Sequence, residues 1–82
     1  MTHSATVRHT VQVDFGIHVA EDIVGSMVTG LGAAGIVHQD PADARRFIVE
    51  VLRPAKLAYL KQELSRWEAY GFLRWEEISS SD

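Results

Sequence analysis

Residues 6–15 read TVRHTVQVDF, and the alternation within this stretch decides the fold. One face of the stretch is mainly apolar and carries Val7, His9, Val11, Val13 and Phe15. The other face carries Thr6, Arg8, Thr10, Gln12 and Asp14. A period of two, rich in β-branched residues, is typical of a strand buried on one side. The sequence therefore predicts a sheet with one covered face and one open face.

A second stretch, residues 45–53 (RRFIVEVLR), alternates in the same way. Phe47, Val49 and Val51 fall on one side, and Ile48, Glu50 and Leu52 fall on the other. Two shorter strands are predicted at 36–39 (IVHQ) and 72–78 (FLRWEEI). The composition of DPADA at 40–44 indicates the turn between two of these strands.

Two segments have helical spacing instead. The first begins near Val19, ends in the glycines at 30, 32 and 35, and repeats apolar residues at Val19, Ile23, Met27 and Leu31, with Val24 and Val28 beside them. The second covers residues 55–70 behind Pro54, which suits the first helical position. Its apolar residues are Leu57, Leu60, Leu64 and Trp67, and Gly71 is placed to end it.

The predicted order is strand, helix, strand, strand, helix, strand. This order favours the α+β ferredoxin-like βαββαβ sandwich, a four-stranded antiparallel sheet with two helices on one face. The first and third strands, which are the longest and most β-branched, then lie at the centre of the sheet. We expect one domain over residues 1–82, with an ordered core at about 6–78 and a frayed tail at 79–82.

The glycines at 30–35, GLGAAG, match the dinucleotide-binding pattern G-x-G-x-x-G. That pattern binds phosphates only where it follows a strand and opens a helix. Here it follows a helical stripe and leads into a strand. We therefore expect a helix end and a tight turn in which glycine adopts positive φ, and no cofactor site.

Composition argues against several classes of site and partner. The chain has no cysteine, which excludes disulfides and thiolate metal sites, and its four histidines have no zinc-binding spacing, so no metal is expected. No secretory signal and no membrane span are evident, which favours a cytoplasmic protein with no membrane partner. A net charge of −3 and an open face without aromatic residues on its two central strands argue against nucleic acid as a partner.

Charge is distributed unevenly along the chain. Residues 45–66 hold six of the eight basic residues, and residues 67–82 are acidic. Such asymmetry could orient a partner, although an ordinary solvated helix face is the simpler interpretation.

Catalytic patterns are weak, and we expect no enzyme. The serines lie in a helix or in the terminal tail, and Glu76 and Glu77 are adjacent, so on a strand they point to opposite faces. His9 shares the apolar face of its strand and is interpreted as a structural histidine, with His18 and His38 at the surface. A small enzyme that uses His9 or His38 is the third hypothesis.

The open face is the predicted partner-binding surface. Apolar side chains there, mixed with polar ones, resemble the composition of a protein interface, whereas scattered surface apolar residues are the plain alternative. A second possible surface is the helix that carries Tyr59, Trp67 and Tyr70, with Trp67 expected in the core. The predicted binding residues of the open face are Arg8, Thr10, Gln12, Ile48, Glu50, Leu52 and Trp75.

The leading hypothesis is a small non-enzymatic interaction domain that binds and blocks a larger protein complex. Its size and composition resemble the inhibitors and accessory factors of phages and mobile elements, of which anti-CRISPR proteins are one class. A homodimer formed through the open face is another outcome of the same surface. The alternative function is a dimeric small-molecule-sensing regulatory domain, with the glycine turn at 30–35 lining its pocket.

Overall fold

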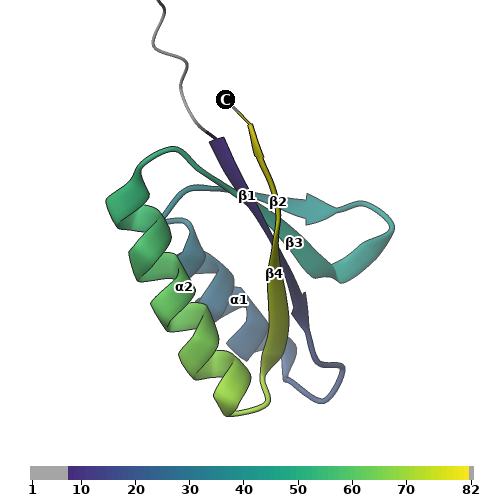
Figure 1. The fold of residues 1–82 in the computed structure, drawn as a ribbon. Coiled ribbons are helices and arrows are strands. Elements are labelled where there is room, and N and C mark those ends of the chain that lie inside the picture. Colours follow the sequence, from purple (N-terminus) through teal and green to yellow (C-terminus); the bar gives the residue numbers. More distant parts are fainter. Residues whose placement is uncertain (1–7, 82) are drawn as a thin grey trace, which may run out of the picture.

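The computed structural model describes residues 8–81, which form one four-stranded antiparallel sheet and two helices (Figure 1). The strand order across the sheet is β2-β3-β1-β4. This βαββαβ arrangement confirms the predicted α+β ferredoxin-like fold. The elements are β1 (Arg8–Phe15), α1 (Glu21–Leu31), β2 (Ile36–Asp40), β3 (Asp43–Val51), α2 (Pro54–Ala69) and β4 (Leu73–Ser81). Thr6 and Val7 of the predicted first strand, and His3, lie outside the described residues.

The core lies between the sheet and the helices, and the two central strands supply its floor. β1 and β3 pair with Val11 opposite Val49 and Val13 opposite Phe47, and all four side chains are buried. The rings of Phe15 and Phe47 meet edge to face, with 5.7 Å between their centroids. The alternation of both strands thus predicted the covered face correctly.

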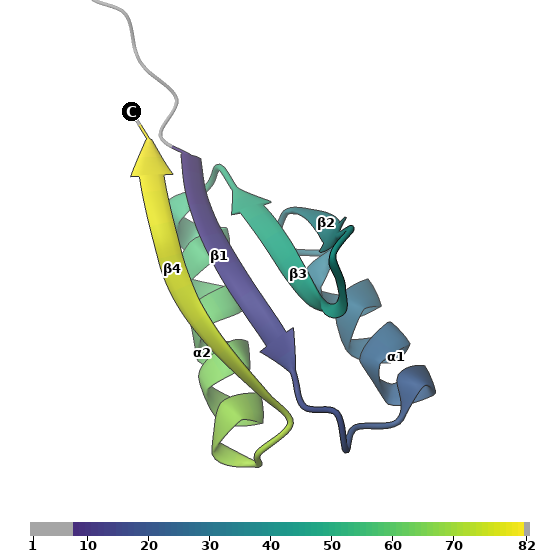
Figure 2. The ribbon, with the colours of Figure 1, turned by 90° about the vertical axis from the view of Figure 1, so that its right-hand side faces the viewer.

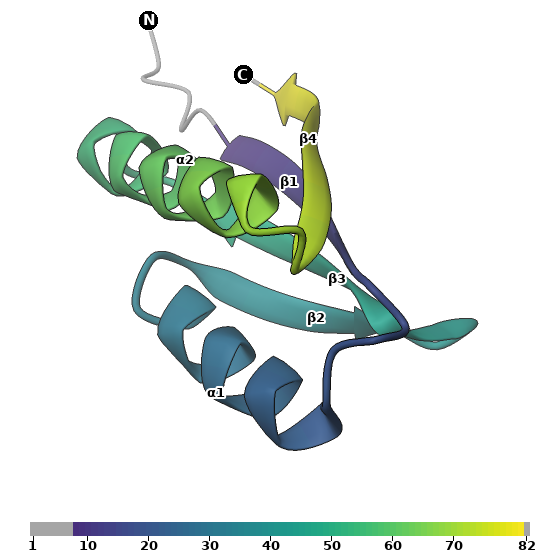
Figure 3. The same cartoon turned by 90° about the horizontal axis from the view of Figure 1, so that it is seen from below.

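The helices close the core from one side of the sheet (Figure 3). In α2, Pro54 occupies the start, Leu57, Leu60 and Leu64 are buried, and Trp67 packs partly against the core, as the spacing predicts. Gly71 follows α2 with a φ of 82° and ends it in the left-handed conformation that glycine tolerates.

The first helix differs from its prediction at its start and at Ile23. α1 begins at Glu21, so the buried Val19 precedes it, and Ile23, expected in the buried stripe, is exposed. Val24 and Leu31, both in the predicted apolar set, are the buried positions of α1 and lie seven residues apart on one face. Ile23 is adjacent to Val24 and therefore lies about 100° away around the helix, outside this narrow stripe.

The glycine turn after α1 has a different cause from the one predicted. None of Gly30, Gly32 and Gly35 has a positive φ. Gly35 is instead required by close approach, because a Cβ at this position would lie 2.2 Å from the main-chain oxygen of Glu50. The absence of a side chain lets the chain pass against β3 and enter β2.

The end of the chain is also more regular than expected. Residues 79–81 of the predicted tail continue β4 and pair with residues 8–10 of β1, and Asp82 lies outside the described residues. A register shift opposite Thr10 and Val11 accommodates the extra length as a β-bulge. The main chain of β1 offers hydrogen-bonding partners whatever the side chains of residues 79–81 are, so a polar composition did not prevent pairing.

A matched pair of glycine substitutions tests the close approach. Gly35→Ala should lower the free energy of unfolding by about 1–3 kcal/mol, because the neighbouring atom belongs to the main chain and cannot turn away. Gly25→Ala, in the exposed interior of α1 with no atom within 4 Å of the new Cβ, should raise it by about 0.5–1 kcal/mol. Urea denaturation measures both values. Equal effects of the two substitutions would contradict the proposed role of Gly35.

Candidate functional site

The open face of the sheet is the side that neither helix covers (Figure 2). The structure brings most of the predicted residues together there, because they alternate with buried positions on β1 and β3. Thr10 lies opposite Glu50, and Gln12 lies opposite Ile48. These four side chains are half-buried by their neighbours, and Arg8 is exposed. Leu52 follows the last residue of β3 and is also exposed.

Trp75 does not belong to this face, which corrects the prediction. It lies opposite Val13, and paired residues of adjacent strands share a face, so Trp75 packs against the core beside the helices. Its indole Nε1 is buried and has no hydrogen-bond partner among the described residues. The register of β4 decided this placement, and the sequence alone did not fix that register.

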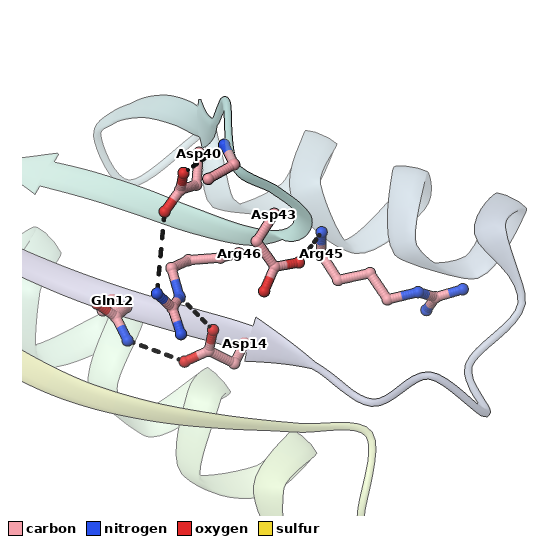
Figure 4. Close-up of polar contacts among 7 residues, drawn as sticks. Gln12, Asp14, Asp40, Asp43, Arg45 and Arg46 are labelled. Carbon is pink, nitrogen blue, oxygen red and sulfur yellow. Dashed lines mark hydrogen bonds and ion pairs between the residues drawn. The ribbon is translucent and has the colours of Figure 1, made fainter.

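One half of the open face is an ion-pair ladder across the sheet (Figure 4). Arg46 Nε donates to Asp14 Oδ1 at 2.7 Å, and Arg46 Nη1 lies 3.9 Å from Asp40 Oδ2. Gln12 Nε2 donates to Asp14 Oδ2 at 3.0 Å. Partial burial works to raise the pKa of Asp14, but the hydrogen bonds from Arg46 and Gln12 outweigh it and lower that pKa. The charges of Asp14, Arg46 and Asp40 in the ladder therefore satisfy one another.

A hollow of about 250 Å³ lies at the end of the open face, where β2, β3 and the turn after α1 meet the start of α2. Ile36 and Leu52 line it and are 56% and 47% exposed, so both present apolar surface to solvent. Arg53 and Lys56 line it as well, and neither forms an ion pair within residues 8–81. We refer to Ile36, Leu52, Arg53 and Lys56 as the basic corner.

Two further features border the basic corner. Glu50 lines the hollow, and its carboxylate oxygens lie 3.8 Å from Arg8 Nη1 and 3.5 Å from His38 Nε2. The glycine turn forms the opposite wall, from Gly32 to Gly35. Glu50 is thus engaged by its neighbours, and the charges of the corner that have no ion pair in the described part of the chain are positive.

Sequence reasoning missed three members of this corner. Ile36 was read only as part of a short strand, and its position opposite Glu50 appears once β2 and β3 are paired. Arg53 and Lys56 belong to the basic stretch at 45–66, whose ordinary interpretation was a solvated helix face. Of the second predicted surface, Tyr59 and Tyr70 are exposed, whereas Trp67 packs against the core as expected.

The three histidines within residues 8–81 make contacts in the fold. His9 Nδ1 lies 3.0 Å from Glu77 Oε2, and Lys61 Nζ lies 2.8 Å from Glu77 Oε1. Hydrogen bonds from Lys61 and then from His9 lower the pKa of Glu77. This cluster ties β1, β4 and α2 together. His18 Nε2 lies 3.0 Å from the main-chain oxygen of Gly71, which joins the loop before α1 to the turn after α2.

No group of three or more His, Asp or Glu side chains in residues 8–81 is arranged to hold a metal ion. Neither α1 nor α2 is long and apolar enough to cross a membrane.

Comparisons with known proteins identify no relative. The chain matches no family model, and no curated protein or solved structure resembles it at a significant level. The function is therefore argued from the geometry of the site alone.

The lowered pKa of Asp14 predicts a pH-dependent contribution to stability. Since the folded-state value lies below the ordinary value of 3.8, the ionised carboxylate stabilises the fold above that value. The contribution is lost as the pH falls through the folded-state pKa. Asp14→Asn should lower the free energy of unfolding at about pH 6 by roughly 0.2–1 kcal/mol, as for solvent-accessible ion pairs, and the deficit should shrink below the ordinary pKa.

Glu76→Gln is the matched control, because Glu76 is exposed on β4 and forms no ion pair among the described residues. Denaturation curves between about pH 6 and pH 2.5 compare the two variants with the parent chain. A deficit of Asp14→Asn that stays constant over this range would contradict the assignment.

Proposed function

We propose that the chain is a non-enzymatic protein-interaction domain whose basic corner binds an acidic segment of a partner protein. One observation carries this proposal. Two exposed apolar side chains, and two cations without an ion pair among residues 8–81, surround a single hollow where the open face meets the turn after α1 and the start of α2.

The apolar part of the corner favours an anchored side chain. Burial of exposed apolar surface drives association, and binding energy concentrates where one partner inserts a side chain into a pocket of the other. The hollow between Ile36 and Leu52 is about 250 Å³, which suits one large side chain rather than a folded surface. A leucine, methionine or aromatic residue of the partner would fill it.

The charged part favours an acidic sequence around that anchor. Arg53 and Lys56 stand at the start of α2, where the helix dipole adds positive potential. Carboxylates are the protein groups that form charge-assisted hydrogen bonds with such cations. A segment with Asp or Glu on both sides of an apolar anchor therefore complements the corner better than a basic or neutral one.

Self-association through the whole open face is less favourable. Such packing would bury the ladder formed by Asp40, Arg46 and Asp14, and removing paired charges from water can cost more than their attraction returns. A partner that covers only the basic corner leaves the ladder in solvent. The proposal therefore commits to a different protein as the partner.

Blocking is the mode of action that this surface suggests. A small domain that holds an acidic segment of a larger complex would cover whatever that segment normally contacts. An inhibitor or accessory factor of the kind carried by phages and mobile elements, anti-CRISPR proteins included, would act in this way.

A small-molecule-sensing domain remains the second candidate because the glycine turn lines the hollow, as that hypothesis requires. A metabolite bound there would raise the melting temperature, and Gly32→Val would remove the increase. Thermal scans of the parent chain and this variant against a metabolite collection distinguish this candidate from a protein partner.

Affinity capture tests the proposed function. The tagged chain is incubated with lysate of its source cells, and the recovered proteins are quantified by mass spectrometry. The parent chain is compared with two double variants, Ile36→Asp with Leu52→Asp and Arg53→Glu with Lys56→Glu. We expect one partner to be recovered in stoichiometric amount and lost by about tenfold or more with either double variant, since each removes a central contact. Recovery should also fall as salt is raised, because exposed charges are screened.

Ile23→Asp is the control, since Ile23 is 43% exposed on α1, outside the residues that line the corner. This variant should retain the partner. Circular dichroism and melting curves verify that every variant is folded. Recovery that is unchanged in both double variants, or lost equally with Ile23→Asp, would contradict the assignment of the basic corner.

A further inference from the structure

A second cavity lies away from the basic corner, between α1 and the β2–β3 hairpin. Its volume is about 290 Å³, near the lower end of the roughly 300–1,000 Å³ of small-molecule sites. α1 forms one side of it, beside β2 (Figure 3), and β3 contributes the other. Its lining includes Glu21, Val24, Gly25, Val28, Arg45 and Phe47, together with Gln39 and Ala44 of the hairpin.

The floor of this cavity is apolar. Val24 and Phe47 belong to the buried core, and Val28 packs against that core. Gly25 lies within α1 at the cavity, and a Cβ built there would meet no atom within 4 Å. Glycine inside a helix is unfavourable, and here no neighbouring atom requires it, so its effect is to leave the cavity open on the α1 side.

The rim carries one positive and one negative group. Arg45 is held in place because its Nη1 donates to the main-chain oxygens of Gly16 and Val19, each at 2.8 Å. Figure 4 shows its side chain extended away from Arg46 and the ladder. Its Nε and Nη2 make no hydrogen bond within residues 8–81, and no carboxylate pairs with it there. Glu21, in the first turn of α1, likewise forms no ion pair in the described chain.

We propose that this cavity binds a free α-amino acid with an apolar side chain. The carboxylate would pair with the remaining N–H groups of Arg45, in the geometry that guanidinium and carboxylate prefer. The ammonium would pair with Glu21, and the side chain would lie on Val24, Val28 and Phe47. A zwitterion is selected because both charges of the rim then gain a partner, whereas a simple anion or cation leaves one of them unpaired.

Calorimetric titration with L-leucine and L-phenylalanine tests the ligand class directly. We expect saturable binding of at least one of them with a stoichiometry of one. The analogues 4-methylpentanoate, which lacks the ammonium group, and 3-methylbutylamine, which lacks the carboxylate, should bind about tenfold more weakly than leucine or worse, as expected for loss of a charged hydrogen-bonded pair. The proposal would be overturned if either analogue bound as tightly as leucine. It would also be overturned if neither L-leucine nor L-phenylalanine bound.

Variants of α1 locate the site. Gly25→Leu should abolish binding by filling the cavity, and Glu21→Gln should weaken it about tenfold. Asp22→Asn is the matched control, because Asp22 is an exposed acid in the same helical turn and does not line the cavity. The assignment of the site would be overturned if Glu21→Gln bound the amino acid as tightly as the parent chain. It would also be overturned if Asp22→Asn weakened binding as much as Glu21→Gln does. Neither double variant of the basic corner should alter amino-acid binding, so this inference and the proposed function can fail separately.

Discussion

The pairing of β1 with β3 in a single register is the constraint on which the rest of the structure depends. Val11 opposite Val49 and Val13 opposite Phe47 place the apolar side chains of both strands on one face. Because side chains alternate, a slip of one residue would turn the apolar set of one strand toward solvent. The same register brings Asp14 beside Arg46, so the polar face is fixed by the packing of the apolar one.

The basic corner follows from this register through one glycine. Gly35 passes against the main chain of β3 at Glu50, and only a residue without a side chain fits there. β2 then begins at Ile36, directly opposite Glu50 and beside the hollow that Leu52 lines. A substitution that pushed the turn away from β3 would displace Ile36 from the hollow. The proposed binding surface and the stability of the turn are therefore coupled through Gly35.

Several features followed from the sequence because the local pattern and the tertiary environment agree. The alternation of residues 8–15 and of Phe47, Val49 and Val51 identified the covered face, and the spacing of Leu57, Leu60 and Leu64 identified the buried face of α2. The features that did not follow depend on contacts between distant segments. Trp75 was misplaced because its face depends on the register with β1, and the continuation of β4 over residues 79–81 was not predicted because their partner is the start of β1.

The candidate site likewise combines residues that the local pattern identifies with residues that only tertiary contacts bring together. Ile48, Glu50 and Leu52 were recognisable as open-face positions from alternation alone, whereas Arg53 and Lys56 become part of the site only when α2 begins beside β2 and β3. The central claim is that this corner, and not the outer surface of α1, meets a partner protein. A photoreactive phenylalanine derivative in place of Leu52, and separately in place of Ile23, tests it by cross-linking in the source cells. Our account predicts one discrete cross-linked product from position 52 that disappears when Arg53 and Lys56 are both changed to glutamate, and none from position 23. Cross-linking from position 23 alone would contradict it.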